Sequence, residues 1–313
     1  MPLSKGPGNG AFLNSGTLSR VRGVVLVVLL AAVGASAAFA SPTPQHRDLP
    51  RVLHYVDTSR TITFPHEKPQ PRPVWTEFWY PPASMGSGPF PLVVFGHGFA
   101  ATPWWYRRLL RDWAAAGYVV AAPIFPLGNQ NAPGGPDESD LVNQPGDMSF
   151  VITRVLTASA SVKSPLSGLV DPEKVAVAGQ SDGAMTAFGA AYEHPFYDDR
   201  IRAALVLSGA ILGPHSWVEH TGVPLLAVQG SADTTNPPIY AHRLFWSVGH
   251  QPKFFLLLHG AGHLPPYTVP GRTFATVMHV TIAFLDHYLG DGSLDAIGTA
   301  AKELPTAELT ALP

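Results

Sequence analysis

A serine lies between two glycines in the run Gly-Gln-Ser-Asp-Gly at residues 179–183. A serine hydroxyl becomes an effective nucleophile when a base takes its proton, and a strained turn between a strand and a helix can present it for attack. The glycines suit such a turn because strand and helix approach closely there. An apolar run precedes the motif and a helix-forming run follows it. We therefore predict that Ser181 is a catalytic nucleophile; an ordinary turn with a capping serine is the alternative.

An acid and a histidine follow the serine, in the chain order that this strand–turn–helix arrangement requires. Asp233 comes just after one short apolar run, and His263 comes just after the next. A histidine in this position takes the serine proton, and the acid holds the imidazole in the correct orientation. We therefore predict Ser181, His263 and Asp233 as nucleophile, base and orienting acid.

Other acids and histidines have simpler explanations. Asp182 stands at the start of a predicted helix, where a carboxylate is favourable for dipole reasons alone. His259 is the main alternative to His263, but it comes directly off an apolar run, and we expect it to be buried support. Three further histidines are interpreted as structural or surface residues, and two aspartates as solvated turn residues. These are His97, His242, His250, Asp198 and Asp199.

The intermediate of such a reaction carries an oxyanion, which two preorganised N–H groups must stabilise. One donor normally belongs to the residue after the nucleophile, and the other to an earlier strand–helix loop. The run Gly-His-Gly-Phe-Ala at residues 96–100 directly follows an apolar run. We predict that the oxyanion hole consists of the backbone N–H groups of Phe99 and Asp182, with Ala100 as the alternative to Phe99.

The elements that must position these residues alternate along the chain. Short, wholly apolar runs predict strands that are buried on both faces, at residues 92–95, 119–122, 175–178, 203–207, 225–228 and 254–258. Helical patterns separate them, at residues 104–116, 147–161, 184–193, 239–248 and 274–289. Two earlier segments alternate like antiparallel strands, at residues 54–64 and 74–80. The pattern predicts an α/β domain over residues 51–290, with a mostly parallel central sheet, helices on both faces and antiparallel strands at the N-terminal edge.

Two segments lack a regular pattern within or after this domain. Residues 126–148 are rich in Gly, Pro and Asn, and loops of this length in compact domains are usually functional or disordered. We expect this segment to form a wall of the substrate cleft. Trp104, Trp105 and Tyr106 could also line the cleft; helix packing is the alternative for these aromatic residues. Residues 291–313 are expected to form a loosely ordered C-terminal tail.

The N-terminus has the pattern of an export signal. Residues 1–40 contain three basic residues, no acidic residue, an apolar run at 24–33 and an Ala-Phe-Ala ending. This order is typical of a secretory signal peptide cleaved after Ala40; an uncleaved membrane anchor is the alternative. Residues 41–50 form a Pro-rich leader. We expect a secreted or periplasmic (cell-envelope) protein with no stable membrane span after cleavage.

Composition excludes several classes of protein. Lysine and arginine number 20 against 22 acidic residues, so a strongly basic nucleic-acid binder is excluded. The absence of cysteine rules out disulfides, a thiolate nucleophile and cysteine-ligated zinc. The chain has no phosphate-binding G-x-x-x-x-G-K-[ST], dinucleotide-binding G-x-G-x-x-G or zinc-binding H-E-x-x-H motif. We expect no cofactor, no metal and no nucleic-acid partner, and nothing in the pattern indicates an oligomeric state.

The order His-Gly, G-x-S-x-G, Asp and G-x-G-H resembles that of the α/β-hydrolase superfamily. The run GHGFAATPWWYRRLLRDWAAAGYVVAAPIFP is similar to secreted esterases grouped with dienelactone hydrolases, chlorophyllases and cutinase-like polyesterases. The resemblance implies carboxylic-ester hydrolysis on a small-molecule or lipid-like ester, and implies that Phe99 supplies an oxyanion donor and lines the acyl pocket. Asp182 replaces an apolar residue of the polyester-cleaving members, which argues against polymers, and the missing cysteine argues against the dienelactone reaction. An acyltransferase, a peptidase or a catalytically silent binding scaffold are the alternatives.

Overall fold

The computed structural model describes residues 50–210, 218–219, 221–249 and 252–312. The expected signal peptide at residues 1–40 and nearly all of the Pro-rich leader lie outside the described residues, as does His250. The described residues belong to one compact unit. Within these ranges, none of the helices combines the length and the apolar character needed to cross a membrane.

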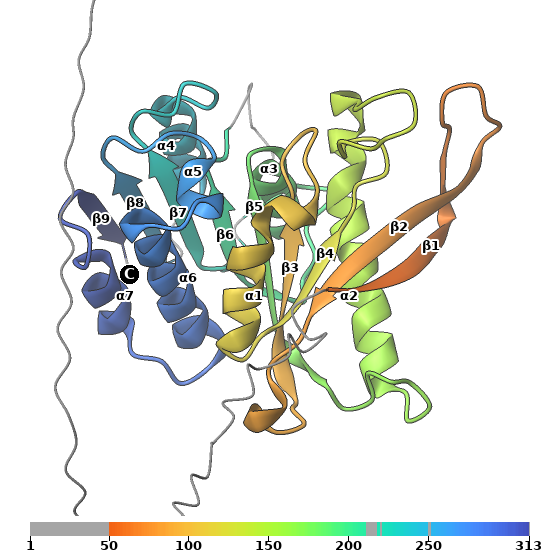
Figure 1. Cartoon of the computed structure of the whole chain (residues 1–313), viewed down its shortest axis with the longest axis horizontal. Coiled ribbons are helices and arrows are strands. Elements are labelled where there is room, and N and C mark those ends of the chain that lie inside the picture. The colour runs from red at the N-terminus through yellow and green to blue at the C-terminus, as the bar shows by residue number, and fades with distance from the viewer. Residues whose placement is uncertain (1–49, 211–217, 220, 250–251, 313) are drawn as a thin grey trace, which may run out of the picture. The chain divides into compact units, whose positions relative to one another are not determined.

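In the described part of the chain, nine strands form a single sheet in the order β1-β2-β4-β3-β5-β6-β7-β8-β9 (Figure 1). The strands are β1 (Arg51–Ile62), β2 (Gln70–Trp79), β3 (Phe90–Gly96), β4 (Val119–Pro123), β5 (Val170–Gln180), β6 (Ile201–Leu207), β7 (Leu225–Gly230), β8 (Lys253–Leu258) and β9 (Ala307–Leu312). From β4 to β8 every neighbouring pair is parallel, whereas β1 and β2 at one edge and β9 at the other pair antiparallel. The predicted α/β-hydrolase architecture is therefore confirmed.

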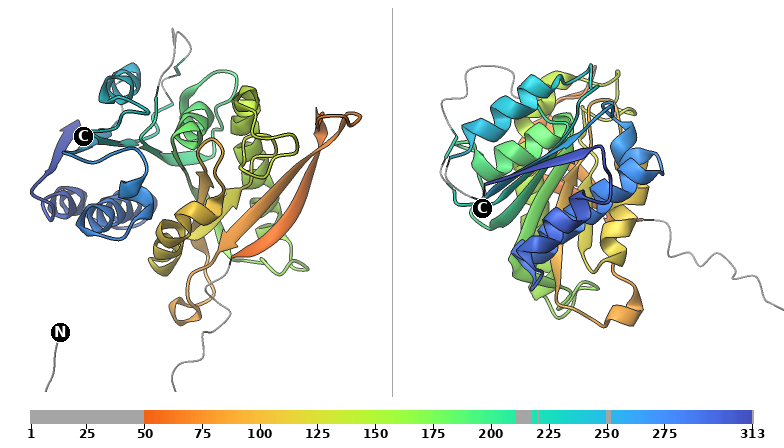
Figure 2. Two further views of the ribbon diagram at one scale, coloured as in Figure 1. Left: turned by 45° about the horizontal axis from the view of Figure 1, so that its top comes forward. Right: turned by 90° about the vertical axis from the view of Figure 1, so that its left-hand side faces the viewer.

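Helices cover both faces of this sheet (Figure 2). They are α1 (Arg107–Ala115), α2 (Gln144–Ala160), α3 (Asp182–Tyr192), α4 (Pro238–Ser247), α5 (Pro265–Thr268), α6 (Arg272–Leu289) and α7 (Leu294–Ala301), with short 3-10 turns η2 (Ala83–Met85), η3 (Pro103–Tyr106) and η4 (Glu138–Asn143). Side chains of α1, α6 and α7 pack in the core on one face, and those of α2, α3 and α4 pack on the other. Crossover helices on both faces account for strands that are apolar on both sides.

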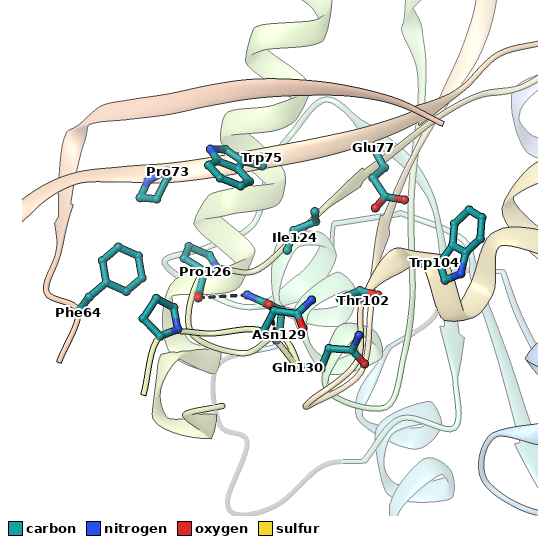
Figure 3. A pocket seen from close by; sticks show the side chains of 12 residues that line it. Phe64, Pro73, Trp75, Glu77, Thr102, Trp104, Ile124, Pro126, Asn129 and Gln130 are labelled. Carbon is teal, nitrogen blue, oxygen red and sulfur yellow. Dashed lines mark hydrogen bonds between the residues drawn. The ribbon is translucent and has the colours of Figure 1, made fainter. Parts of the chain in front are cut away.

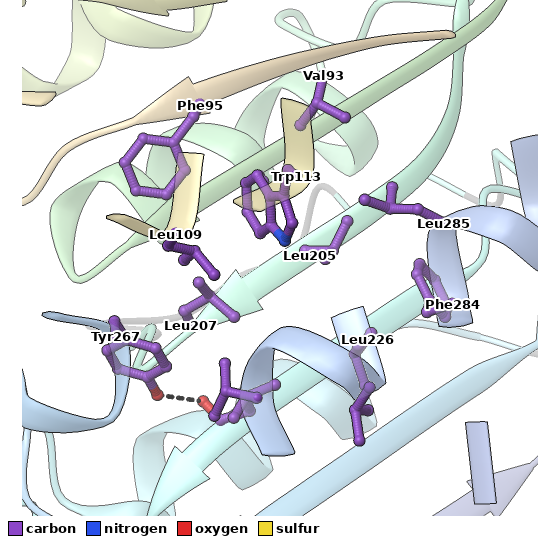
Figure 4. Packing of buried hydrophobic residues seen from close by; sticks show 14 of the residues in the cluster. Val93, Phe95, Leu109, Trp113, Leu205, Leu207, Leu226, Tyr267, Phe284 and Leu285 are labelled. Atoms are coloured by element: carbon purple, nitrogen blue, oxygen red, sulfur yellow. Dashed lines mark hydrogen bonds between the residues drawn. The ribbon is translucent and has the colours of Figure 1, made fainter. Parts of the chain in front are cut away.

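Within each apolar run of the sequence, alternate side chains point into the two cores. Val93 and Phe95 of β3 face the α1–α6 side, whereas Leu92 and Val94 face the α2–α3 side. On the first side they pack with Trp113 of α1 and residues of α6 (Figure 4). Successive strand side chains point to opposite faces, so an unbroken apolar run serves two cores at once.

The C-terminal segment differs from the expectation of a loosely ordered tail. Residues Leu294–Ala301 form α7, whose Ile297 is buried in the core shared with α6. Residues Ala307–Leu312 form β9, which pairs with all of β8. Most β9 side chains are exposed, so the strand has no apolar run of its own. It forms because the open edge of β8 supplies unpaired backbone groups, which a local pattern does not reveal.

The segment at residues 126–148 is also more regular than expected. Residues 138–143 form η4, where the Asp137 side chain accepts a hydrogen bond from Ser139 N, and α2 begins at Gln144. Pro145 and Gly146 gave this part the composition of a loop. Proline fits the first turn of a helix, where its missing N–H has no partner to lose.

A buried ion-pair network ties the β1–β2 hairpin to this segment. Arg72 of β2 is 1% exposed, and its guanidinium lies 2.7 Å from Asp140 of η4 and 2.7 Å from Asp147 of α2. Arg60 of β1 also lies 2.7 Å from Asp147 and 2.6 Å from Asp57. The network holds the hairpin against η4 and α2, and thereby positions the side chains of β2, including Trp75 and Glu77.

Candidate active site

Ser181 lies in a strained turn at the end of β5. Its φ of 58° and ψ of −123° are unusual for a residue with a side chain, and a conformation of this kind costs about 1–3 kcal/mol. A Cβ at Gly179 would stand 1.9 Å from the Gly183 carbonyl oxygen, and one at Gly183 would stand 2.0 Å from that of Gly96. The two glycines are thus required by close backbone approach, as the motif predicted. The turn presents Ser181 at the carboxyl edge of the sheet.

Ser181, His263 and Asp233 are brought together from the ends of three parallel strands. His263 Nε2 lies 3.0 Å from Ser181 Oγ, and His263 Nδ1 lies 2.8 Å from Asp233 Oδ2. With the proton on Nδ1, the imidazole donates to the carboxylate and leaves Nε2 to accept the serine proton. This geometry allows proton transfer from the hydroxyl to the base.

Several donors fix the Asp233 carboxylate in place. Its side chain is fully buried, and Oδ1 accepts hydrogen bonds from the backbone N–H groups of Thr235 (3.0 Å) and Asn236 (2.8 Å). Oδ2 accepts a further bond from Gln229 Nε2 at 3.1 Å, in addition to the bond with His263. The carboxylate therefore has one orientation only, and it transmits that orientation to the imidazole.

Two backbone N–H groups near Ser181 are free to bind an anion. No described residue accepts a hydrogen bond from Phe99 N–H, and Asp182 is the first residue of α3, where N–H groups have no intrahelical partner. The Ala100 N–H already donates to the Gly128 carbonyl at 2.9 Å. The geometry therefore favours Phe99 over Ala100 as the oxyanion donor.

The side chain of Asp182 lies in an unfavourable environment. It is 8% exposed, and its Oδ2 has no hydrogen-bond partner among the described residues. Desolvation, with a smaller contribution from the charge of Glu138, raises the pKa of Asp182 to about 6. The carboxyl group, on the same residue as an expected oxyanion donor, is thus held partly in its neutral form near pH 6, which weakens its repulsion of a developing negative charge.

A hydrogen-bonded chain behind the site was not foreseen from the sequence. Tyr106 Oη donates to Gln180 Oε1 at 2.6 Å and accepts a bond from Gly98 N–H at 3.3 Å. Gln180 Nε2 donates to the His263 carbonyl oxygen at 3.2 Å and lies 3.2 Å from His263 Nε2. The chain connects the loop of Phe99 to the histidine. Gln180 is the first variable position of G-x-S-x-G, so the motif itself carries no signal for it.

The structure confirms one of the remaining interpretations of histidines and aspartates and contradicts two. His97 is structural, since it is 1% exposed, its Nε2 accepts from Phe125 N–H, and burial lowers its pKa to about 4. His259 is not buried: it is exposed and contacts Glu308 of β9 at 3.2 Å. Asp198 is not a solvated turn residue either, because it is buried against Arg200 and Ser149. Both differences involve a partner 49 residues away in the sequence, Glu308 for His259 and Ser149 for Asp198.

A cavity of about 530 Å³ lies beside the loop of residues 97–102, the Phe99 loop, and between β2 and the segment after β4 (Figure 3). Its walls are mostly apolar and include Phe64, Trp75, Trp104, Ile124 and several prolines. Residues 126–133, from the segment that was expected to line a substrate cleft, contribute part of the wall of this cavity. Glu77 of β2 reaches into this cavity (Figure 3).

The described residues contain no group of three or more histidine, aspartate or glutamate side chains arranged to hold a metal ion. No curated protein sequence matches the chain significantly. The model of the chlorophyllase family matches residues 52–209, about half of the chain. The matched segment includes Phe99, Ser181 and Asp182 and ends before Asp233 and His263. The chain therefore belongs to the chlorophyllase family, a family of α/β-hydrolase type with an esterase-like function.

Proposed function

We propose that this protein is a secreted serine hydrolase that cleaves carboxylic esters through an acyl-enzyme intermediate. The observation that carries the proposal is the position of His263, whose two ring nitrogens lie 3.0 Å from Ser181 Oγ and 2.8 Å from Asp233 Oδ2. Two free N–H groups beside the serine complete the set of groups that acyl transfer requires.

In the proposed reaction, Ser181 Oγ attacks the ester carbonyl carbon while His263 Nε2 takes its proton. Asp233 orients the imidazole and stabilises its cationic form. The N–H groups of Phe99 and Asp182 bind the oxyanion. The tetrahedral intermediate collapses when His263 returns the proton to the departing alcohol, leaving the acyl group on the serine. Water, deprotonated by the same histidine, then attacks the acyl carbon, and the second tetrahedral intermediate collapses as His263 returns the proton to Ser181 Oγ and the acid leaves.

Initial rates on a series of p-nitrophenyl esters from acetate to palmitate would test this proposal. We expect the variant Ser181→Ala to lose turnover by about 10⁴-fold or more, because removal of a nucleophile leaves only the binding groups. The variant Ser161→Ala, on the surface after α2, should retain full activity. A fluorophosphonate probe should label the wild type and not Ser181→Ala. Hydrolysis that survives in Ser181→Ala would refute the assignment.

Export is the second part of the proposal, and it rests on the pattern of residues 1–40. We expect the protein recovered from a bacterial culture medium or periplasm to begin at Ser41, as N-terminal sequencing would show. Full-length chain retained in the membrane fraction would favour the uncleaved anchor instead.

A further inference from the structure

Glu77 is a buried carboxyl group without a partner. The residue is 9% exposed, and Oε2 is buried with no hydrogen-bond partner among the described residues. Desolvation raises its pKa to about 7. A carboxylate left unpaired in an apolar environment is destabilising, so a group of this kind usually serves a purpose beyond stability.

This carboxyl group points into the cavity beside the Phe99 loop. Figure 3 shows it directed toward the space between Ile124, Thr102 and Trp104. Among the described residues that line the cavity there is no arginine, lysine or histidine, and Glu77 is the one ionisable residue. The remaining polar groups of the wall, from Thr102 and asparagine or glutamine side chains, are neutral. The cavity therefore disfavours anions and is complementary to a positive charge.

The walls of the cavity also suit a cation that has an apolar body. Phe64, Trp75 and Trp104 contribute aromatic rings, whose faces attract positive charge. His54 stacks on Trp75 at 4.5 Å between ring centroids, and the Arg107 guanidinium lies 4.5 Å from the Trp104 ring. These contacts hold both indoles in place before any ligand arrives, which reduces the entropic cost of binding.

One loop connects the cavity with the candidate active site, because Thr102 lines the cavity and Phe99, three residues earlier, is an expected oxyanion donor. Ala100 N–H donates to Gly128 O at 2.9 Å, and Gln130 N–H donates to Ala101 O at 3.1 Å, so the Phe99 loop is bonded to the segment that lines the cavity. Strands β3 and β4 separate β5, which carries Ser181, from β2, which carries Glu77. Three strand spacings amount to about 14 Å across the sheet, and Ser181 lies three residues, about 10 Å, beyond the level of Glu77 along the strands. The span is therefore about 17 Å, which the arm of a long, extended ester can bridge.

We propose that this cavity binds an organic cation, an alkylated ammonium group on an apolar body, as the remote arm of the ester that Ser181 attacks. The link to hydrolysis rests on the proposed function, whereas binding of the cation does not. Glu77 supplies the countercharge, and the aromatic walls enclose the alkyl groups.

Binding is tested first, on the variant Ser181→Ala, so that no turnover interferes. The probes are choline and its uncharged isostere 3,3-dimethylbutan-1-ol. Their binding at pH 8 is measured by ligand-observed NMR or by tryptophan fluorescence. We expect choline to bind about tenfold more tightly than the alcohol. Equal binding of the two probes, or no binding of choline, would overturn the proposal.

Charge removal at Glu77 then locates the site. In Glu77→Gln the preference for choline should fall to near one, whereas the matched surface variant Glu173→Gln should keep it. Trp75→Leu should reduce the preference by severalfold through the loss of one aromatic face. Thermal melts of each variant would verify folding. A preference that persists in Glu77→Gln would place the cation elsewhere and refute the assignment.

Catalysis is tested with two p-nitrophenyl esters whose acyl chains end either in trimethylammonium or in tert-butyl. We expect the wild type to favour the ammonium ester by about tenfold in kcat/KM, and Glu77→Gln to lose this preference. If choline binds but no ester is hydrolysed, the proposed function fails and the cation site stands. If both esters are hydrolysed equally and choline does not bind, the cation site fails and the hydrolase stands.

Discussion

Two buried carboxyl groups of this protein lie in opposite circumstances. Asp233, 3% exposed, accepts hydrogen bonds from Gln229, Thr235 and Asn236 and contacts His263. Glu77, 9% exposed, leaves Oε2 without any partner among the described residues. A buried charge is tolerated where donors surround it and is destabilising where they do not.

The difference separates a site in which the protein positions every partner from a site in which the described residues supply none. Around Ser181 the protein supplies the partners itself, so the geometry needed for proton transfer exists before substrate binds. In the cavity beside the Phe99 loop the protein supplies an apolar wall and one acid, and it leaves the partner to the ligand. Removal of the charge at Asp233 should therefore impair the protein, whereas removal of the charge at Glu77 should stabilise it.

The largest effect is expected at the fully partnered acid. Asp233→Asn keeps the shape of the side chain but removes the charge that holds Nδ1–H of His263, so the imidazole adopts the wrong tautomer or orientation. We expect kcat on p-nitrophenyl esters to fall by about 10⁴-fold, as steady-state kinetics would measure. Asp199→Asn, at an exposed position, should leave kcat unchanged. Activity close to wild type in Asp233→Asn would show that another acid orients the histidine.

We expect the substitution Glu77→Gln to raise the free energy of unfolding by an amount that depends on pH. The pKa of Glu77 rises on folding from 4.5 to about 7, so between these values the folded state keeps a proton that the unfolded state has lost. Stability therefore decreases as pH rises through this window and is lower by about 3 kcal/mol above it. Glu77→Gln lacks this titration.

Urea denaturation at two pH values measures that effect. Near pH 4.5 the wild type and Glu77→Gln should have similar free energies of unfolding, and at pH 8 the variant should be more stable by about 1–3 kcal/mol. Glu173→Gln, at an exposed position, controls for the removal of charge as such. A variant less stable than wild type at pH 8 would mean that Glu77 has a favourable partner, contrary to the comparison.

The substitution Tyr106→Phe tests whether the hydrogen-bonded chain behind Ser181 and His263 contributes to stability and activity. Tyr106→Phe removes the hydroxyl that joins Gly98 N–H to Gln180 Oε1 and leaves both groups unsatisfied. We expect a loss of about 1–3 kcal/mol in the free energy of unfolding, together with a lower kcat. Tyr197→Phe, at an exposed position, provides the matched control. A variant as stable and active as wild type would show that water replaces the hydroxyl without cost.

The smallest effect is expected at Asp182, which is buried like Asp233 but has an unpartnered oxygen like Glu77. Its pKa is about 6, so it is largely charged at pH 8 and largely neutral at pH 5. Asp182→Asn should raise kcat/KM by about threefold at pH 8, because it removes a charge that opposes the oxyanion. The ratio of variant to wild type should approach one at pH 5. A lower rate at pH 8 would indicate that the carboxylate contacts substrate favourably.

Most of the fold and the proposed catalytic residues could be predicted because their signals are local. The apolar runs mark the parallel strands, and Ser181, Asp233 and His263 each follow such a run closely. What could not be predicted depends on distant partners. The strand β9 exists only through pairing with β8, and His259 is exposed because it turns toward Glu308 on that strand.

The sequence by itself determined the α/β order, the motif around Ser181 and the chain order of the acid and the histidine, because hydrophobic periodicity and backbone sterics act over a few residues. Only the tertiary structure decided which groups became partners: Tyr106 with Gln180, the open edge of β8 with β9, and Glu77 with no hydrogen-bond partner in the described part of the chain. Burial and hydrogen bonding are properties of the surroundings that the whole chain creates, and a residue's own neighbours in sequence do not specify them.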